Sequence, residues 1–147
     1  MFTLAAALCF CLVCRGQSNG FTGTHVQYIP PAQGEYSVFS SITKYLAAGD
    51  EVALSSWFAD NLDITVISTT RNCSKKQARE ILKGFFNANT PRSFTVTHKA
   101  SEKGKKYLIG QLNAGGELFE VTIYATSSGQ EPYKIQQLGI ARQTGAY

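Results

Sequence analysis

Two side chains on predicted strands, His98 and Asp63, have the chemistry to transfer a proton. In the segment "SFTVTH", His98 shares its parity with Phe94 and Val96, so we expect its imidazole to face the apolar side of the strand, toward the helices. A carboxylate or imidazole against an apolar wall has a shifted pKa, which suits general acid–base catalysis near neutral pH. His98 is therefore the weak catalytic candidate of this sequence.

Other interpretations of these polar residues stay open. A histidine on an apolar strand face is more often a hydrogen-bonded core residue than a base. Asp63 has the opposite parity from Leu62 and Ile64, so we expect it to face away from them and to make a poor base. Tyr107 and Tyr124 are possible hydroxyl donors. The sequence holds no G-x-S-x-G or H-E-x-x-H motif and no nucleophile–base pair at recognisable spacing.

The sequence predicts no metal site, no cofactor and no nucleic-acid partner. Of the two histidines, His25 falls in a predicted linker, and Cys73 is the one cysteine outside the N-terminal apolar run, so no ligand cluster forms. Lys103, Lys105 and Lys106 crowd a predicted hairpin turn, where we expect a solvated tip. No aromatic residue is interleaved with them, as single-strand binding would require.

A set of aromatic side chains at helix and strand spacing predicts either a filled core or a cup for a small apolar ligand. If the rings form a filled core, they pack on one another, which is the commoner arrangement of aromatic stripes. If they form a cup, they line it, and a few polar groups orient the ligand. The candidate pocket residues are Trp57, Phe58, Phe85, Phe86, His98 and Phe119.

Composition and the N-terminal segment indicate one exported globular domain. The 147 residues include 44% hydrophobic and 16% charged residues, with a net charge of +4, which is typical of an ordered protein. The run "MFTLAAALCFCLVCRG" is shorter than the ~20 apolar residues that span a bilayer, and it ends in a polar stretch. We expect a signal peptide at 1–16, a linker at 17–33 and a domain at 34–142. The mature protein would be secreted or periplasmic, without a stable membrane anchor.

The elements that position these residues begin with helices. A helical stripe is predicted from Glu35 to Gly49, and Asp50 can cap a short second helix that includes Trp57 and Phe58. The stripe of the first helix consists of Val38, Phe39, Ile42, Tyr45 and Leu46. The segment "NLDITVIS" follows as a single strand.

A third helix starts at a capping box and ends before Pro91. Ser74 and Gln77 each satisfy a backbone donor of the first turn. Its apolar stripe consists of Ala78, Ile81, Leu82, Phe85 and Phe86. Cys73 precedes the helix and is expected to act as a small buried hydrophobic side chain.

Four strands complete the pattern, and short glycine-bearing turns make them antiparallel neighbours. They are predicted near Phe94–His98, Lys106–Leu112, Glu117–Ala125 and Tyr133–Arg142. In the last strand, Ile135 and Leu138 differ in parity, which indicates a bulge. Helices segregated from a strongly bent, largely antiparallel sheet make an α+β domain shaped as a cone.

The outer face of this sheet is predicted to be partly apolar, which would suit a homodimer. The expected outward set is Leu108, Leu112, Leu118 and Tyr124. The expected inward set is Ile109, Phe119, Val121 and Ile123.

The segments "VFSSITKYLAAGD", "CSKKQAREILKGFFNANTPRSFTVTH", "YLIGQL" and "YKIQQLGI" carry a resemblance to a known family. From Val38 to Ile140 the chain resembles a Bacteroidetes family of small secreted domains of unknown function, in the nuclear transport factor 2-like, cystatin-like α+β superfamily. Cys73 stands where that family is expected to have an aromatic residue. The resemblance implies a cone-shaped fold and export, but no catalytic residues.

Together these observations predict a non-catalytic binding or interaction module. The wider superfamily includes dehydratases, isomerases and epoxide hydrolases with an Asp, His or Tyr inside the cone. The resemblance therefore implies an alternative, a small hydrolase, dehydratase or isomerase that uses His98.

Overall fold

The protein is seen in a computed structural model that describes residues 33–129 and 132–144, with side chains from Val38 onward. The predicted signal peptide at 1–16 and nearly all of the predicted linker lie outside the described residues. The fold is that of the unit that spans Gln33–Tyr147. No helix in the described part of the chain combines the length and apolarity needed to cross a membrane.

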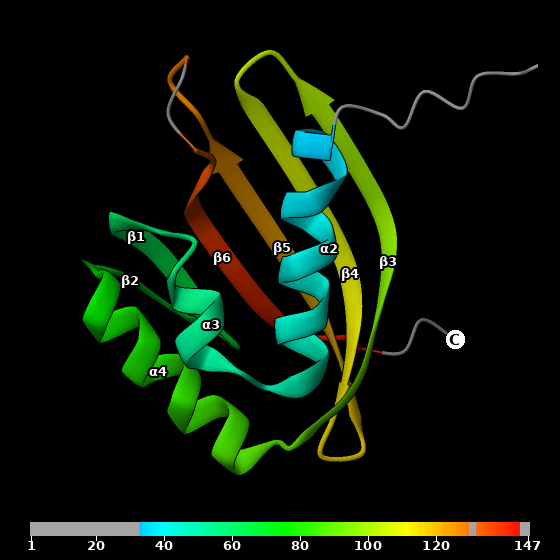
Figure 1. Cartoon of the computed structure of the whole chain (residues 1–147). Helices are drawn as coiled ribbons and strands as arrows, with labels where there is room; N and C mark the ends of the chain where they lie inside the picture. Colours follow the sequence, from blue (N-terminus) through cyan, green and yellow to red (C-terminus); the bar gives the residue numbers. More distant parts are fainter. Residues whose placement is uncertain (1–32, 130–131, 145–147) are drawn as a thin grey trace, which may run out of the picture. The chain divides into compact units, whose positions relative to one another are not determined.

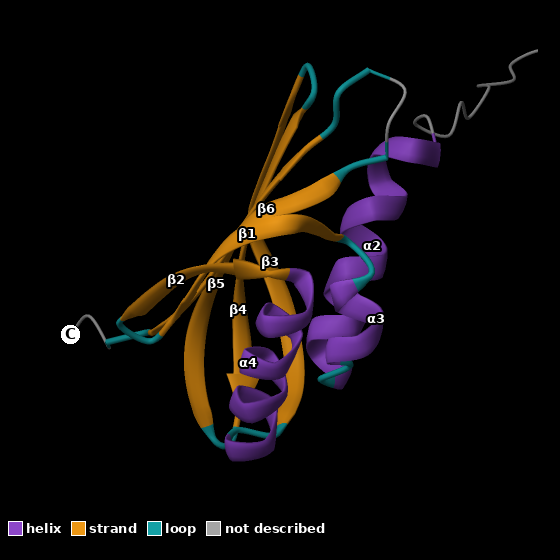
Figure 2. Ribbon diagram, turned by 90° about the vertical axis from the view of Figure 1, so that its left-hand side faces the viewer, coloured by secondary structure: helices purple, strands orange, loops and turns teal. Residues whose placement is uncertain are grey.

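Within the described residues, three helices cover one face of a six-stranded mixed sheet. The elements are α2 (Gln33–Ala48), α3 (Glu51–Ser55), β1 (Phe58–Val66), β2 (Thr69–Ser74), α4 (Lys75–Ala88), β3 (Pro91–Glu102), β4 (Lys105–Ala114), β5 (Glu117–Thr126) and β6 (Lys134–Arg142). The strand order is β2-β1-β6-β5-β4-β3 (Figure 1). Only β1 and β6 pair in parallel, among the described strands. Figure 2 shows the helices on one side and no described helix on the opposite, outer face. The predicted α+β architecture is confirmed.

The helix starts follow the predicted caps. The backbone N–H of Ala53 donates to Asp50 Oδ1 at 2.9 Å, which starts α3. The α3 helix ends at Ser55, so the prediction that it includes Trp57 and Phe58 is wrong. Phe58 is instead the first residue of β1, because its backbone pairs with Ile135 of β6.

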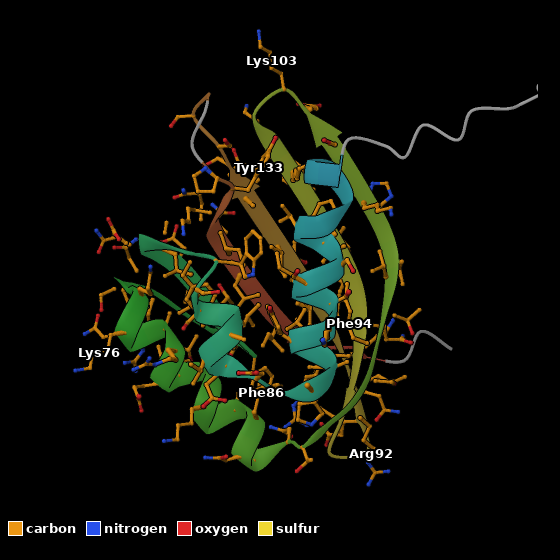
Figure 3. All side chains as sticks on the ribbon, in the orientation of Figure 1. Lys76, Phe86, Arg92, Phe94, Lys103 and Tyr133 are labelled. Carbon is orange, nitrogen blue, oxygen red and sulfur yellow. The ribbon has the colours of Figure 1, made fainter. Side chains whose placement is uncertain are left out.

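The α4 helix confirms the capping box and the apolar stripe. Gln77 N–H donates to Ser74 Oγ at 3.2 Å, and Ser74 N–H donates to Gln77 Oε1 at 3.0 Å. Phe85 and Phe86 are buried, and Figure 3 shows Phe86 below α3, beside the lower part of α4. Lys76 of the same helix points away from the sheet (Figure 3). The helix therefore closes the concave face.

One strand was missed by sequence reasoning. The sequence predicted a single strand, at residues 61–68, between the second and third helices, but β1 and β2 form a hairpin there with Val66 opposite Thr69. Ile67 occupies the turn with φ of 63°, a conformation that is rare for a β-branched residue. Its N–H donates to Ile140 of β6 at 2.6 Å. The turn has no Gly, Pro, Asn or Asp to indicate it in the sequence.

The register of β4 and β5 corrects the predicted faces of the sheet. Leu108 lies opposite Ile123 and Leu112 lies opposite Phe119, so all four share one face. Leu108 and Leu112 are fully buried under the helices, and their assignment to the outer face is wrong. The predicted inward position of Ile109 is wrong for the same reason. The cause is a two-residue turn that places Ala114 opposite Glu117, which pairs even residues with odd ones.

Bulges decide the faces of β3 and β6. In β6, Tyr124 pairs with Gln137 and Ala125 with Ile135, so Gln136 is extra, and the predicted bulge is confirmed. In β3, Val96 and His98 pair with consecutive residues of β4, which makes Thr97 extra. The sequence did not predict this second bulge.

Lys106 corrects another prediction. It was expected on a solvated hairpin tip, yet only 1% of it is exposed, because it shares the inward face of β4 with Leu108. Its Nζ donates to Ser101 Oγ at 3.2 Å and lies 4.9 Å from the ring centre of Tyr133. Lys103, at the tip of the β3–β4 hairpin, does point into solvent (Figure 3).

Candidate functional site

The outer face of the sheet carries a hollow formed by residues from five strands. It has a volume of about 280 Å³. It is lined by Asp63 and Thr65 of β1, Thr70 of β2, Tyr107 of β4, Thr122 and Tyr124 of β5, and Gln137, Leu138 and Gly139 of β6. We call it the outer hollow.

Cross-strand pairing aligns this lining in two neighbouring rows. Because directly opposite residues share a face, each row crosses the sheet on the outer side. The tyrosine row consists of Tyr107, Tyr124, Gln137, Asp63 and Asn72. The glycine row consists of His98, Ile109, Thr122, Gly139, Thr65 and Thr70.

An aromatic pair forms one wall of the outer hollow. The ring centres of Tyr107 and Tyr124 are 4.7 Å apart, with a 34° angle between the ring planes. Tyr107 is 41% exposed and Tyr124 is partly buried. In the tyrosine row Tyr124 stands between Tyr107 and Gln137, and both tyrosines line the hollow.

Gly139 forms the floor of the outer hollow. A Cβ atom built there would meet only Thr122, at 3.9 Å from its Cβ and 4.0 Å from its carbonyl oxygen, which is ordinary contact. The glycine is therefore not required by close packing or by a positive φ. Its effect is to leave open the space that a side chain would occupy between Thr122 and Thr65.

The opposite wall is polar. The hydroxyls of Thr65 and Thr70 are hydrogen-bonded at 2.8 Å, and Asn72 Nδ2 donates to Asp63 Oδ1 at 2.8 Å. One Asp63 oxygen thus orients toward the hairpin partner, and the carboxylate keeps further acceptor sites. Neither Lys nor Arg is among the residues that line the outer hollow.

The structure separates His98 from the other predicted pocket residues. His98 is exposed and pairs with Ile109 on the outer face, so its predicted position facing the helices with Phe94 and Val96 is wrong. The physical reason is the Thr97 bulge, which reverses the parity of the strand. An exposed imidazole lacks the apolar wall on which the catalytic hypothesis depended.

The predicted aromatic residues of the cup are brought together in the core. Phe85 packs edge-on against Phe119, with ring centres 5.0 Å apart, and against Phe86 at 5.8 Å. Phe58 is fully buried in the same cluster, and Trp57 is partly buried against it. None of the four described hollows is lined by these rings. Their contacts with one another are those of a packed core.

Three other hollows lie elsewhere on the described surface. Two of them, of about 610 and 330 Å³, share Arg71 and Ile81 between β2 and α4. The larger one carries charges of both signs, Lys76 and Glu80, on exposed side chains. The third, of about 540 Å³, borders the two hairpins beside residues 130–131, which lie outside the described residues. None of these three is lined by an aromatic residue.

Cys73 lies at the edge of the larger β2–α4 hollow as a buried thiol. Burial raises its pKa, Arg71 opposes the shift and Asp63 adds to it. A thiol with a raised pKa is a poor nucleophile at neutral pH. No group of three or more His, Cys, Asp or Glu side chains that could hold a metal ion occurs among the described residues.

A family model described as a domain of unknown function, DUF4783, matches residues 39–141. The chain belongs to the DUF4783 family. The resemblance predicted from the sequence is thus confirmed. No curated protein matches the sequence significantly.

Solved structures show the fold of this DUF4783 domain. A DUF4783 family protein from Bacteroides uniformis is 20% identical with a TM-score of 0.68, over 72% of this chain and 97% of that one. An NTF-2 like protein of unknown function from Silicibacter pomeroyi is 12% identical with a TM-score of 0.57, over 75% and 93%. A domain of unknown function with a cystatin-like fold from Nostoc punctiforme is 10% identical with a TM-score of 0.62, over 78% and 80%. The predicted nuclear transport factor 2-like, cystatin-like fold is confirmed.

Sequence reasoning named only part of the outer hollow. Asp63, Tyr107 and Tyr124 were candidates, but for a site inside the cone. Thr65, Thr70, Thr122, Gln137 and Gly139 were missed. The available signal was the polar alternation of β1 and β5 together with a glycine inside the apolar run of β6.

Proposed function

We propose that this DUF4783 domain is a non-catalytic binding module whose ligand-contacting surface is the outer hollow. The observation that carries the proposal is the Tyr107–Tyr124 pair, which stands partly exposed beside a glycine-floored depression. Aromatic rings in such a position gain free energy when a ligand covers them. A few convergent polar groups around such a wall are typical of small-molecule sites.

Packing favours the outer hollow over the cone interior as the binding surface. The rings first expected to hold an apolar ligand are buried and contact one another. A ligand between Phe85 and Phe119 would have to separate rings that are 5.0 Å apart. The outer hollow requires no such rearrangement, because it is already open to solvent.

A homodimer through the outer face is the competing occupant. The apolar set expected to drive it loses Leu108 and Leu112, which are buried. It keeps Tyr124 and Leu118, which is 45% exposed, and the outer face gains the partly buried Ile109. Glu120 and Thr122, both exposed, lie beside Leu118 on the same face. Stable homodimer interfaces bury at least ~1,000 Å² with an apolar centre, so this polar face favours a small ligand.

The proposal is tested by titrating isotope-labelled protein with a library of small neutral, charged and aromatic compounds. Backbone amide NMR shifts should cluster in the tyrosine and glycine rows. Shifts that cluster instead around Phe85 and Phe119 would favour the cone interior. A library without any hit on the outer face would contradict the proposal.

The enzymatic alternative, a small hydrolase, dehydratase or isomerase, has its own test. Purified wild type and His98→Ala are assayed with ester, epoxide and hydroxyacyl substrates. We expect no turnover above background by either protein. Turnover that the His98→Ala substitution abolishes would replace the binding proposal with the enzymatic one.

We also propose that the domain works outside the cytoplasm, in the periplasm or as a secreted protein. The support is the apolar run within 1–16 and the small residues at Cys14 and Gly16, the positions that a signal peptidase reads. Fusion of 1–33 to a reporter that is active only after export should give an active reporter cleaved after Gly16. An intact, inactive fusion would refute the export proposal.

A further inference from the structure

The outer hollow combines two kinds of surface that one class of ligand needs at the same time. Its aromatic wall consists of Tyr107 and Tyr124, whose rings are apolar. Its remaining lining offers three threonine hydroxyls, a side-chain amide and a carboxylate, from Thr65, Thr70, Thr122, Gln137 and Asp63. Together these groups can donate and accept hydrogen bonds around the hollow.

Resting on the proposed binding function, we propose that the outer hollow binds one ring of a neutral saccharide. A pyranose ring has C–H-rich faces that pack on an aromatic ring and a rim of hydroxyl groups that donate and accept. Tyr124 would support the face of the ring. Gln137, which pairs with Tyr124 in the tyrosine row, and Asp63, which pairs with Gln137, would form hydrogen bonds with the hydroxyl rim of the ring.

The charge of the lining selects a neutral ring. Asp63 is its one ionisable carboxylate, and the residues that line the hollow include no cation to balance an anionic ligand. A uronic acid, a sulfated sugar or a nucleotide would place a negative charge near that carboxylate, which is unfavourable without a paired cation. A purely apolar ligand would cover the Thr122 hydroxyl and the Gln137 amide without forming hydrogen bonds to them.

The size of the outer hollow limits the ligand to a single ring at its floor. Its volume of about 280 Å³ lies near the lower end of the ~300–1,000 Å³ of typical ligand sites. The floor is open only because residue 139 is glycine. A valine there would project its methyl groups between Thr122 and Thr65, where the ring would lie.

Gly139→Val is therefore the decisive variant, because it fills the outer hollow without removing any existing contact. The built Cβ meets no atom closer than 3.9 Å, so the variant should fold, and β-branched residues suit strands. Tyr124→Ala removes the supporting ring. Leu118→Ala is the matched control, since it truncates an exposed apolar side chain of β5 that does not line the hollow.

The protein is tested against an array of immobilised oligosaccharides that includes neutral, uronic and sulfated members. The affinity for the best neutral member is then measured by calorimetry for the wild type and the three variants. We expect a neutral saccharide to bind, with NMR shifts at residues 122, 124 and 139. Gly139→Val and Tyr124→Ala should each weaken binding by at least about tenfold, while Leu118→Ala should change it less than about twofold.

Contrary outcomes separate this inference from the proposed function. Preference for anionic sugars, or neutral binding that survives Gly139→Val, would overturn the saccharide inference. Failure of every sugar while nucleosides or other library compounds shift the same rows would also overturn it, but would leave the binding function intact. If the wild type sediments as a dimer and Tyr124→Ala sediments as a monomer, the outer face binds a second copy of the chain instead of a saccharide.

Discussion

Two adjacent cross-strand pairs of β4 and β5 have opposite environments. Leu108 and Ile123 are fully buried beneath the helices, whereas Tyr107 and Tyr124, the next residues along the strands, form a partly exposed pair on the outer face. The backbone pairing is continuous through both. The covering layer of helices, and not the strand itself, therefore determines whether an apolar pair lies in the core or on the surface.

The two faces also differ in what their side chains achieve. On the inner face, apolar residues exclude water and hold α4 on the sheet. On the outer face, threonine, glutamine and tyrosine side chains surround a depression that no described helix covers. Substitutions should therefore affect stability mainly from the inner face and binding mainly from the outer one.

The largest expected effect is that of Phe119→Ala on the inner face. Its ring is fully buried and packs on Phe85 at 5.0 Å. The free energy of unfolding should fall by about 3–5 kcal/mol, from lost burial and the cavity left behind. Urea denaturation measures it. A decrease in the free energy of unfolding below about 1 kcal/mol would contradict the proposed difference between the two faces.

Gly110→Ala should have the next largest effect, because it overpacks the same inner face. A Cβ at this position would lie 2.2 Å from the Phe94 ring and 2.8 Å from the Thr95 carbonyl oxygen. We expect a loss of about 1–3 kcal/mol. Gly139→Ala on the outer face is the matched comparison, and should change the thermal midpoint little. Equal effects of the two glycine substitutions would contradict the open floor of the outer hollow.

Ser74→Ala tests the element that covers the inner face. The substitution removes the hydroxyl that accepts from Gln77 N–H at the start of α4. Stability should fall by about 1 kcal/mol, as is typical of lost caps. Circular dichroism during urea denaturation measures the change, and Ser74→Asp, which keeps an acceptor, should largely restore it.

Cys73 gives a pH-dependent prediction for the edge of the helix-covered side. Its thiol has a raised pKa in the folded state, chiefly from burial. Above the ordinary thiol pKa of about 8.5, the unfolded thiol ionises while the folded one stays protonated. Stability should therefore fall as pH rises through that value, and Cys73→Ala should lack this component. Identical pH profiles for both proteins would contradict the prediction.

The smallest expected effect on stability is that of Tyr124→Ala. Exposed cross-strand aromatic pairs contribute roughly 0.2–1 kcal/mol, so thermal unfolding should shift only slightly. The same variant should lose ligand binding, which sharpens the contrast with Phe119→Ala. A stability loss comparable to that of Phe119→Ala would mean that the tyrosine pair serves the fold.

Much of the fold could be predicted because its signals are local. The Ser74 capping box, the Phe85–Phe86 stripe and the parity change between Ile135 and Leu138 each depend on a few neighbouring residues. The Thr97 bulge and the β1–β2 turn have no such signal, since Thr97 resembles its neighbours and Ile67 is an unusual turn residue. Only part of the candidate site was predicted from the sequence, because the outer hollow combines residues of five strands.

The helices, their caps and the number of strands after α4 could be read from the sequence, since these follow from periodicity and local backbone preference. The face that each strand shows to the helices could not, because it depends on how the strands pair in the folded sheet. Strand register is set by turns and bulges, and a single extra residue such as Thr97 exchanges the two faces. That exchange placed His98 in water, and the β4–β5 register placed Leu108 in the core and the two tyrosines beside an open hollow.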